Sequence, residues 1–245
     1  MSPQKLFTLD IGNSSSKLLS WNNGAPGKSF CSFDNVSPDD LVIFSSVKNN
    51  PKLPHTKNLY EIKQKNTALF GNMPVKYGEK AGVDRLIFAY SIFQKIVGHS
   101  EKFLLIDLGT YCTMDIVTHQ GFLGGLILPG TKEMIRSYKG ADQILQNSQH
   151  SKVTGELKFP FKDSHSTISN AGIFCIESCL EKIIRDQAPS KVITTGGGGK
   201  HISSFLDKLK VDHNHHPFAL HDGIYSLYSW ELGHTEKTME YQSTL

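Results

Sequence analysis

Apolar and polar positions follow the same order in two distant parts of the chain. Residues 6–21 begin with an apolar stretch, reach an Asp-x-Gly sequence at Asp10, pass through small polar side chains and become apolar again. Residues 103–118 repeat this order around Asp107. Two apolar strands around a polar turn are typical of a β-hairpin, in which glycine supplies the backbone freedom for the turn. The sequence therefore predicts two related hairpins in a duplicated lobe, rather than a solenoid with its shorter repeats.

The rest of the chain predicts alternating strands and helices. Apolar runs predict strands at residues 41–47, 124–130 and 192–195. Apolar residues at helical spacing, or helix start signals, predict helices at 83–97, 168–184, 201–209 and from residue 219. A further helix is predicted from Thr131, as its N-cap, to about Lys139. The polar residues 147–164 predict an exposed loop.

This alternation of strands and helices is typical of an α/β protein. We expect two lobes, residues 1–100 and 101–233, each led by one Asp-x-Gly hairpin, and a disordered tail over residues 234–245. Ligands of such proteins bind in concave sites between domains, so we expect a ligand in the crevice between the lobes.

Composition narrows the range of functions. The 245 residues carry a net charge of +3, which does not favour nucleic acid or an anionic membrane surface as the main partner. The N-terminal residues lack the apolar core of a secretory signal, and no stretch approaches the ~18 consecutive apolar residues of a membrane span. The four cysteines lack paired spacing. We therefore expect a cytoplasmic protein with reduced thiols.

The two Asp-x-Gly turns carry the strongest chemical signal. Phosphoryl transfer requires a divalent cation, donors around the phosphate oxygens and an oriented nucleophile. Asp10 and Asp107 are hard oxygen ligands for Mg²⁺, directly or through water, or for another cation. A single Asp-x-Gly is a common turn, whereas two copies with matched strands favour a nucleotide site. Backbone or side-chain donors to the phosphates are then expected at Gly12, Asn13, Ser14, Lys17, Gly109, Thr110 and Thr113.

Two later features are weaker signals. Gly196 and Gly197 follow a strand directly and would allow close backbone approach to a nucleotide base or ribose. Four histidines lie close together in the sequence, without i,i+4 helical spacing or nearby cysteines. These histidines are His213, His215, His216 and His221. We predict that they lie in a solvated loop, and a zinc site is the alternative.

Together these motifs resemble the type III pantothenate kinases of the actin-like ATPase superfamily. The resemblance rests on four blocks in the family's order, which span most of the chain: residues 10–17, Gly82-Val-Asp-Arg85, residues 107–113 with the glycines up to residue 130, and residues 195–197. Gly-x-Asp-Arg between the two hairpins is characteristic of this kinase type. The resemblance implies duplicated actin-like (ribonuclease H-like) lobes with the active site in the cleft between them.

The resemblance also implies roles for single residues. It makes Asp84 the catalytic base, a carboxylate that accepts the proton of a primary alcohol. Gly82 and Arg85 would contact the substrate, and the planar guanidinium suits an anionic or carbonyl group. Tyr77 and Thr167 match family positions that build the pantothenate pocket near a homodimer interface. The implied cofactors are ATP, Mg²⁺ and a monovalent cation, K⁺ or NH₄⁺, near Asp107.

The sequence departs from the family pattern at two places. Tyr111 and Cys112 stand where the family commonly has small residues, and the tyrosine could enter a core or crowd the nucleotide. Residues 164–167 differ from the usual Gly-x-Asn-Thr-like sequence, so Thr167 could be an ordinary N-cap. Two alternatives therefore remain beside the pantothenate kinase: an accessory or regulatory protein on the same scaffold, and a kinase of another small alcohol.

Overall fold

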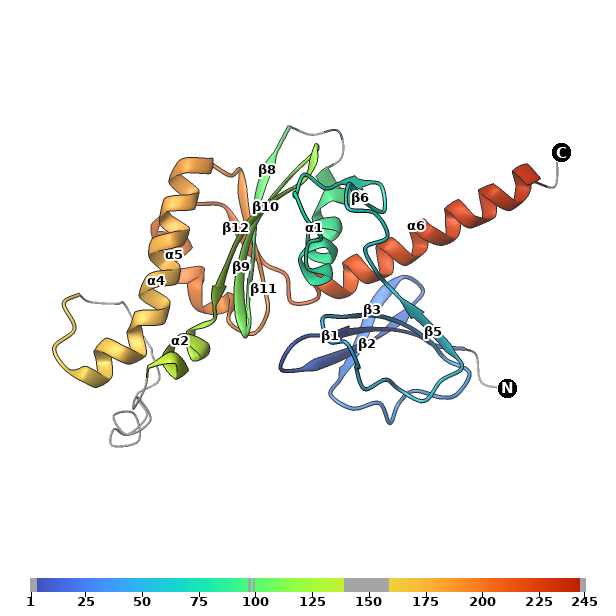
Figure 1. The fold of residues 1–245 in the computed structure, drawn as a ribbon, viewed down its shortest axis with the longest axis horizontal. Helices are drawn as coiled ribbons and strands as arrows, with labels where there is room; N and C mark the ends of the chain where they lie inside the picture. Colours follow the sequence, from blue (N-terminus) through green and yellow to red (C-terminus); the bar gives the residue numbers. More distant parts are fainter. Residues whose placement is uncertain (1–3, 97, 99, 139–158, 243–245) are drawn as a thin grey trace. The chain divides into compact units, whose positions relative to one another are not determined.

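The computed structural model describes residues 4–96, 98, 100–138 and 159–242, with backbone alone at residues 200, 201 and 234–242. The chain forms two compact units, shown in Figure 1. Unit 1 comprises Met1–Glu101, Ile116–Gly124 and Phe218–Leu245, and unit 2 comprises Lys102–Asp115 and Gly125–Pro217.

Unit 1 is built on a five-stranded sheet in the order β3-β2-β1-β4-β5. Its strands are β1 (Leu6–Ile11), β2 (Ser16–Asn22), β3 (Ala25–Phe30), β4 (Leu41–Ser46) and β5 (Asn58–Glu61). A small hairpin of β6 (Leu69–Phe70) and β7 (Met73–Pro74) follows. β1 pairs antiparallel with β2 and parallel with β4, which confirms the first predicted hairpin.

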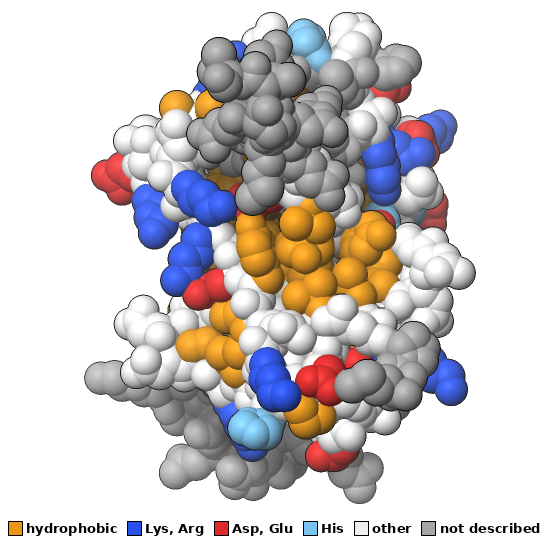
Figure 2. All heavy atoms as spheres, turned by 90° about the vertical axis from the view of Figure 1, so that its right-hand side faces the viewer, with side chains coloured by type: hydrophobic (Ala, Val, Ile, Leu, Met, Phe, Trp, Pro, Cys, Tyr) orange, Lys and Arg blue, Asp and Glu red, His pale blue; other side chains and the backbone are white. Residues whose placement is uncertain are grey.

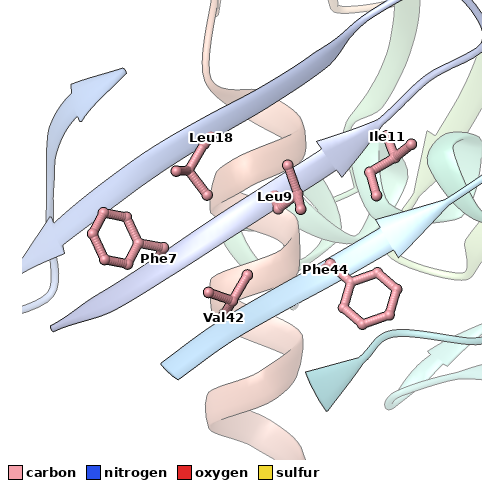
Figure 3. Packing of buried hydrophobic residues seen from close by; sticks show 6 residues of the cluster. All are labelled: Phe7, Leu9, Ile11, Leu18, Val42 and Phe44. Carbon is pink, nitrogen blue, oxygen red and sulfur yellow. The ribbon is translucent and has the colours of Figure 1, made fainter. Parts of the chain in front are cut away.

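Side chains alternate between the two faces of this sheet, as strand geometry requires. One face carries a buried apolar cluster, shown in Figure 3: Phe7, Leu9, Ile11, Leu18, Val42 and Phe44. The polar residues Thr8 and Asp10 alternate with this cluster along β1 and therefore point to the opposite face. Burial of the cluster stabilises β1 and fixes its register, so that Asp10 lies opposite Lys17 on β2 and Ser45 on β4.

Two helices pack together in unit 1: α1 (Val83–Ile96) and α6 (Ala219–Gln242). Their close approach depends on Gly223, where a Cβ atom would lie 2.2 Å from the carbonyl oxygen of Ile87. α6 continues to Gln242, beyond residue 234, from which a disordered tail is predicted. Neither proline nor glycine follows Gly233 to end the helix. Residues 243–245 lie outside the described residues.

A second five-stranded sheet has the order β10-β9-β8-β11-β12. It contains β8 (Lys102–Leu108), β9 (Tyr111–Thr118), β10 (Gly121–Pro129), β11 (Lys191–Thr195) and β12 (His213–His215). β8 and β9 are neighbours, which confirms the second predicted hairpin, and β11 pairs parallel with β8. β8, β11 and β12 lie in unit 2, whereas β9 and β10 each contribute residues to both units. Unit 2 also contains α2 (Thr131–Ser137), α4 (Ser164–Gln187), a 3₁₀ turn η1 (Gly199–Ile202) and α5 (Ser203–Lys208).

Two helix starts differ from the prediction. The N-cap of α2 is Gly130 rather than Thr131, and it makes no side-chain cap hydrogen bond. A Cβ atom at Gly130 would lie 2.2 Å from the carbonyl oxygen of Gly109, which explains the glycine there. α4 begins at Ser164, and its N-cap Asp163 accepts the Ser166 N–H at 2.8 Å. The predicted loop therefore ends one residue earlier than expected, and its residues 147–158 lie outside the described part of the chain.

The described surface mixes several kinds of side chain. On the face shown in Figure 2, a group of hydrophobic side chains lies near the middle, with basic and acidic side chains to its left and below it. Among the described residues, no helix combines the length and apolar character that crossing a bilayer requires.

Candidate active site

The first Asp-x-Gly turn, residues 10–15, follows β1 in unit 1; because it is predicted to bind phosphate, it is called the first phosphate turn. Asp10 is half-buried at the end of the strand, while Asn13 and Ser14 are exposed in the turn. The Gly12 N–H donates to the Ser15 carbonyl oxygen at 3.0 Å and closes the hairpin. Lys17, opposite Asp10 on β2, is exposed. The turn therefore presents a carboxylate, an ammonium group and small polar side chains within a few residues.

The second phosphate turn follows β8 in unit 2 and has the same construction. Asp107 is half-buried, and the Gly109 N–H donates to the Tyr111 carbonyl oxygen at 2.9 Å. The Thr110 carbonyl oxygen accepts the Gly130 N–H at 2.8 Å, which ties the turn to the end of β10. Thr113 is half-buried on β9.

The role predicted for glycine in these turns needs correction. Neither Gly12 nor Gly109 adopts the left-handed backbone conformation that favours glycine. Their N–H groups donate within the turns. The groups that could donate hydrogen bonds to phosphate oxygens are therefore the side chains of Asn13, Ser14 and Thr110. The backbone N–H groups that follow the glycine in each turn could also donate.

Glycine is required instead where β11 meets Asp107. Gly196 has φ +76°, and a Cβ atom there would lie 2.2 Å from Asp107 Oδ1. Gly198 donates its N–H to the Leu108 carbonyl oxygen at 3.0 Å, and its Cβ would lie 2.6 Å from Leu108 Cγ. Gly197, by contrast, is exposed with nothing within 4 Å of its Cβ position. The glycine run thus packs against the carboxylate of the second turn.

The donors of these turns fit a nucleotide-bound cation. Among the described residues, no group of three His, Cys, Asp or Glu side chains could hold a metal ion. Mg²⁺ in nucleotide sites takes one or two carboxylates together with phosphate oxygens and water, and needs no larger protein set. Asp10 in unit 1 and Asp107 in unit 2 are each half-buried carboxylates, which are oxygen ligands of the kind that Mg²⁺ takes.

The two unusual residues of the second turn lie in different surroundings. Tyr111 is 50% exposed, so it does not enter a core. Cys112 is fully buried, and this burial raises the pKa of its thiol to about 12, with further contributions from the nearby charges of Asp107 and Cys179. Cys112 is therefore a packed, protonated thiol rather than a nucleophile.

The Gly-x-Asp-Arg block forms the start of α1. The Arg85 N–H donates to Asp84 Oδ1 at 2.9 Å, which fixes the carboxylate at the helix N-terminus. A Cβ atom at Gly82 would lie 2.7 Å from that same oxygen, so Gly82 leaves room for it. Asp84 is half-buried and Arg85 is buried.

The structure brings Tyr77 to this block and adds an aromatic residue that the sequence analysis missed. The Arg85 Cζ atom lies 5.2 Å from the centroid of the Tyr77 ring and 5.5 Å from that of Phe122. Tyr77, Gly82, Asp84 and Arg85 therefore form one group within unit 1. Phe122 had no local motif to mark it, since its partners are distant in the sequence.

Thr167 lies in unit 2, in the first turn of α4. It is exposed, its N–H donates to the Asp163 carbonyl oxygen at 3.0 Å, and its hydroxyl donates to the same oxygen at 2.8 Å. The cap of this helix is Asp163, so the interpretation of Thr167 as N-cap is wrong. The sequence analysis missed Asp163, although aspartate is a favoured N-cap residue and was the available signal.

Three of the four late histidines lie in regular secondary structure rather than in the predicted solvated loop. His213 and His215 lie on β12, whereas His221 is 3% exposed in the first turn of α6. Its Nδ1 is hydrogen-bonded to Thr8 Oγ1 at 2.8 Å, and Thr8 Oγ1 accepts the Trp21 Nε1–H at 2.9 Å. Burial, together with the charge of Lys17, lowers the pKa of His221 to about 4. The solvated-loop interpretation is therefore wrong for His213, His215 and His221. The apolar helical neighbours of His221 were the available signal.

Comparison with solved structures places this architecture in a known class. A protein described as a Baf family transcriptional activator from Campylobacter jejuni superimposes with a TM-score of 0.61 at 22% identity, covering 93% of this chain and 99% of that one. A protein described as a 2-dehydro-3-deoxygalactonokinase from Sinorhizobium meliloti gives a TM-score of 0.57 at 9% identity, covering 91% and 97%. The paired sheets and phosphate turns define an α/β protein of the actin-like ATPase and sugar-kinase fold, as predicted.

Sequence comparison then identifies the family. The model of the type III pantothenate kinases matches residues 28–186. A type III pantothenate kinase from Campylobacter hominis is 29% identical over 215 residues, covering 85% of this chain and 93% of the relative. Another from Persephonella marina is 32% identical over 162 residues, covering 63% and 60%. The chain belongs to the type III pantothenate kinase family, a family of kinases that use ATP with a divalent metal ion.

Proposed function

We propose that this protein transfers the γ-phosphoryl group of ATP to the primary hydroxyl of pantothenate, giving 4′-phosphopantothenate and ADP. The observation that carries the proposal is the group at the start of α1, where Gly82, Asp84, Arg85 and Tyr77 come together in a chain of this family. The matched range 28–186 includes all four residues.

In the proposed reaction Asp84 is the general base. The pantothenate hydroxyl oxygen forms a bond to the γ-phosphorus while the bond from that phosphorus to the bridging oxygen of ADP breaks. The hydroxyl proton passes to the Asp84 carboxylate, which the Arg85 N–H already orients. Phosphoryl transfer leaves little covalent work to the protein, so the position of this carboxylate matters more than its basicity.

The nucleotide is assigned to the two phosphate turns. We propose that Asp10 holds Mg²⁺, directly or through water, and that Asp107 lies near the monovalent cation, K⁺ or NH₄⁺. Phosphate donors would come from Asn13, Ser14, Lys17, Thr110 and Thr113, and Gly196 leaves room for the Asp107 carboxylate. The cation chemistry supplied there is neutralisation of charge on the phosphate oxygens.

We further propose that pantothenate is contacted by Tyr77, Gly82, Arg85 and Thr167. The protein would form a homodimer with the substrate pocket near its interface, and it would be located in the cytoplasm. The second candidate, an accessory role on the same scaffold, is favoured only by the description of one structural relative as a transcriptional activator. Asp10, Lys17 and Asp84 are all present, which favours the kinase.

The test is ATP-dependent phosphorylation of pantothenate with Mg²⁺ and K⁺, in wild type and in Asp84→Asn. We expect turnover in wild type and a decrease of kcat by about 10²–10⁴-fold in the variant, because the amide cannot accept the proton. Asp39→Asn is the matched control, since Asp39 is an exposed aspartate of the same unit whose ion pair with Lys57 is solvent-screened.

Each outcome has a distinct meaning. Equal kcat in Asp84→Asn and wild type would remove Asp84 from the mechanism while leaving a kinase. No turnover by folded wild-type protein at millimolar ATP would reject the kinase and favour the accessory role.

A further inference from the structure

Phe122 lies where three segments of unit 1 meet. It is fully buried on β10, and its carbonyl oxygen accepts the Lys76 N–H at 2.8 Å. It also forms a parallel bridge with Val75. These backbone contacts hold the segment that carries Tyr77 against β10, so the positions of Phe122 and Tyr77 are fixed relative to each other.

The rings of Tyr77 and Phe122 form a corner around the Arg85 guanidinium. Their centroids lie 5.2 and 5.5 Å from Arg85 Cζ and 6.1 Å from each other, with an interplanar angle of 52°. Rings on opposite sides of the cation would be separated by about the sum of their distances to it, so the two rings are adjacent walls. Arg85 is only 6% exposed, and cation–π attraction is strongest for such a desolvated group.

Gly124 leaves space for the Tyr77 ring. It has φ +89°, and a Cβ atom there would lie 2.8 Å from Cδ2 of the Tyr77 ring. Any other residue would therefore be strained in its own backbone and would also press on the ring. Phe122 and Gly124 thus act on the same two side chains from one strand.

We propose that Phe122 and Gly124 are positioning residues for the acceptor substrate. They hold Tyr77 and Arg85 in the orientation that binds pantothenate, beside the Asp84 carboxylate. This inference rests on the proposed pantothenate kinase activity. A leucine could fill much of the Phe122 volume, but it has no aromatic face to hold a cation. The ring itself is therefore what substrate binding requires.

The test compares Phe122→Leu with Phe70→Leu. Phe70 is a matched control because it is also a buried ring of unit 1, 2% exposed, whose ring contact is with Tyr90 instead of Arg85. For both variants, kcat, the KM for pantothenate, the KM for ATP and the Tm are measured. We expect Phe122→Leu to raise the KM for pantothenate by about 3–30-fold and to leave the KM for ATP unchanged. Phe70→Leu should lower the Tm without changing either KM.

A double-mutant cycle adds a test that core packing alone would not pass. In an Arg85→Met background, Phe122→Leu should have little further effect on the KM for pantothenate, because the cation that the ring holds is already gone. Should Phe122→Leu not fold, Gly124→Ala serves as the second variant. Its control is Gly233→Ala, since nothing lies within 4 Å of the Gly233 Cβ position.

The results separate this inference from the proposed function. Wild-type turnover with the same KM for pantothenate in Phe122→Leu and Phe70→Leu would overturn the positioning role alone. A parallel rise of both KM values would also overturn it, since that would indicate general loosening of the fold. No phosphorylation of pantothenate by wild type would reject the proposed function and this inference together.

Discussion

At the scale of single residues, the two neighbouring glycines after β11 differ in whether a side chain could replace the glycine hydrogen. Gly196 adopts φ +76° and leaves no room for a side chain beside Asp107 Oδ1. Gly197 has ordinary φ and open space around its Cβ position. The sequence presents them as equivalent members of one glycine run, and only the contact with the second phosphate turn distinguishes them.

A pair of alanine substitutions tests this difference. Gly196→Ala should destabilise the protein by about 1–3 kcal/mol, because it introduces backbone strain and a clash with the carboxylate. That corresponds to a decrease in Tm of about 2–10 °C for a protein of this size. Gly197→Ala should leave the Tm nearly unchanged or raise it slightly, by restricting the unfolded chain. Thermal unfolding of the two variants decides the matter, and equal Tm values would contradict the assigned geometry.

At the scale of elements, a buried polar network joins α6 to the strands of the first phosphate turn. Thr8 on β1 connects His221 of α6 with Trp21 of β2. The Trp21 ring also stacks on Tyr225 one helical turn further along α6, with centroids 4.2 Å apart. Thr8 lies two residues before Asp10 on the same face of β1. The network therefore supports the strand that positions Asp10.

His221 should make stability depend on pH in a defined range. Its pKa is 6.5 in the unfolded chain and about 4 in the folded protein, where burial and the charge of Lys17 oppose protonation and the charge of Asp222 favours it. Above pH 6.5 the imidazole is neutral in both states. As the pH falls toward 4 the unfolded chain gains a proton that the folded protein does not, so stability decreases by roughly 2 kcal/mol at pH 5.

The measurement is urea unfolding of wild type and His221→Asn at pH 7.5 and pH 5. Asparagine retains a hydrogen-bonding group but does not titrate, so the variant should lose less stability than wild type over this interval. Other titrating groups contribute to both proteins and cancel in the difference. An identical pH dependence in the two proteins would show that His221 is not protonated more easily in the unfolded chain.

The sequence predicted those elements whose signal is local. Alternation around Asp10 and Asp107 predicted both hairpins, and the spacing of apolar residues predicted α1 almost to the residue. Contacts between distant residues were not predictable in this way. His221 and Thr8 are 213 positions apart, and no local pattern indicates that they meet. The cap of α2 is Gly130 rather than the locally favoured Thr131, and the close approach of Gly109 that requires glycine at residue 130 has no local sequence signal.

At the scale of the whole molecule, the assigned cofactors should be visible as stabilisation. A ligand that binds only the folded state stabilises it by RT ln(1 + [L]/Kd), about 2.7 kcal/mol at a concentration of 100 Kd. For a protein of this size the corresponding rise in Tm is about 5–10 °C. The nucleotide is assigned to turns in both units, so its effect on Tm reports on the two turns without requiring turnover.

We expect ATP with Mg²⁺ to raise the Tm of wild type by that amount, and EDTA to remove most of the rise, because the cation neutralises the phosphate charge beside Asp10. Asp10→Asn should lose the Mg²⁺-dependent part of the shift, and Asp107→Asn should lose the difference between K⁺ and Na⁺ buffers. Asp186→Asn is the control, since Asp186 is an exposed aspartate on α4 that pairs with Lys182. Thermal shifts of these proteins distinguish the two roles. A Tm rise that survives EDTA and both substitutions would show that the nucleotide binds without the two aspartates. That result would reject the cation assignments. The role of Asp84 would be unaffected, because it is tested separately by phosphorylation of pantothenate.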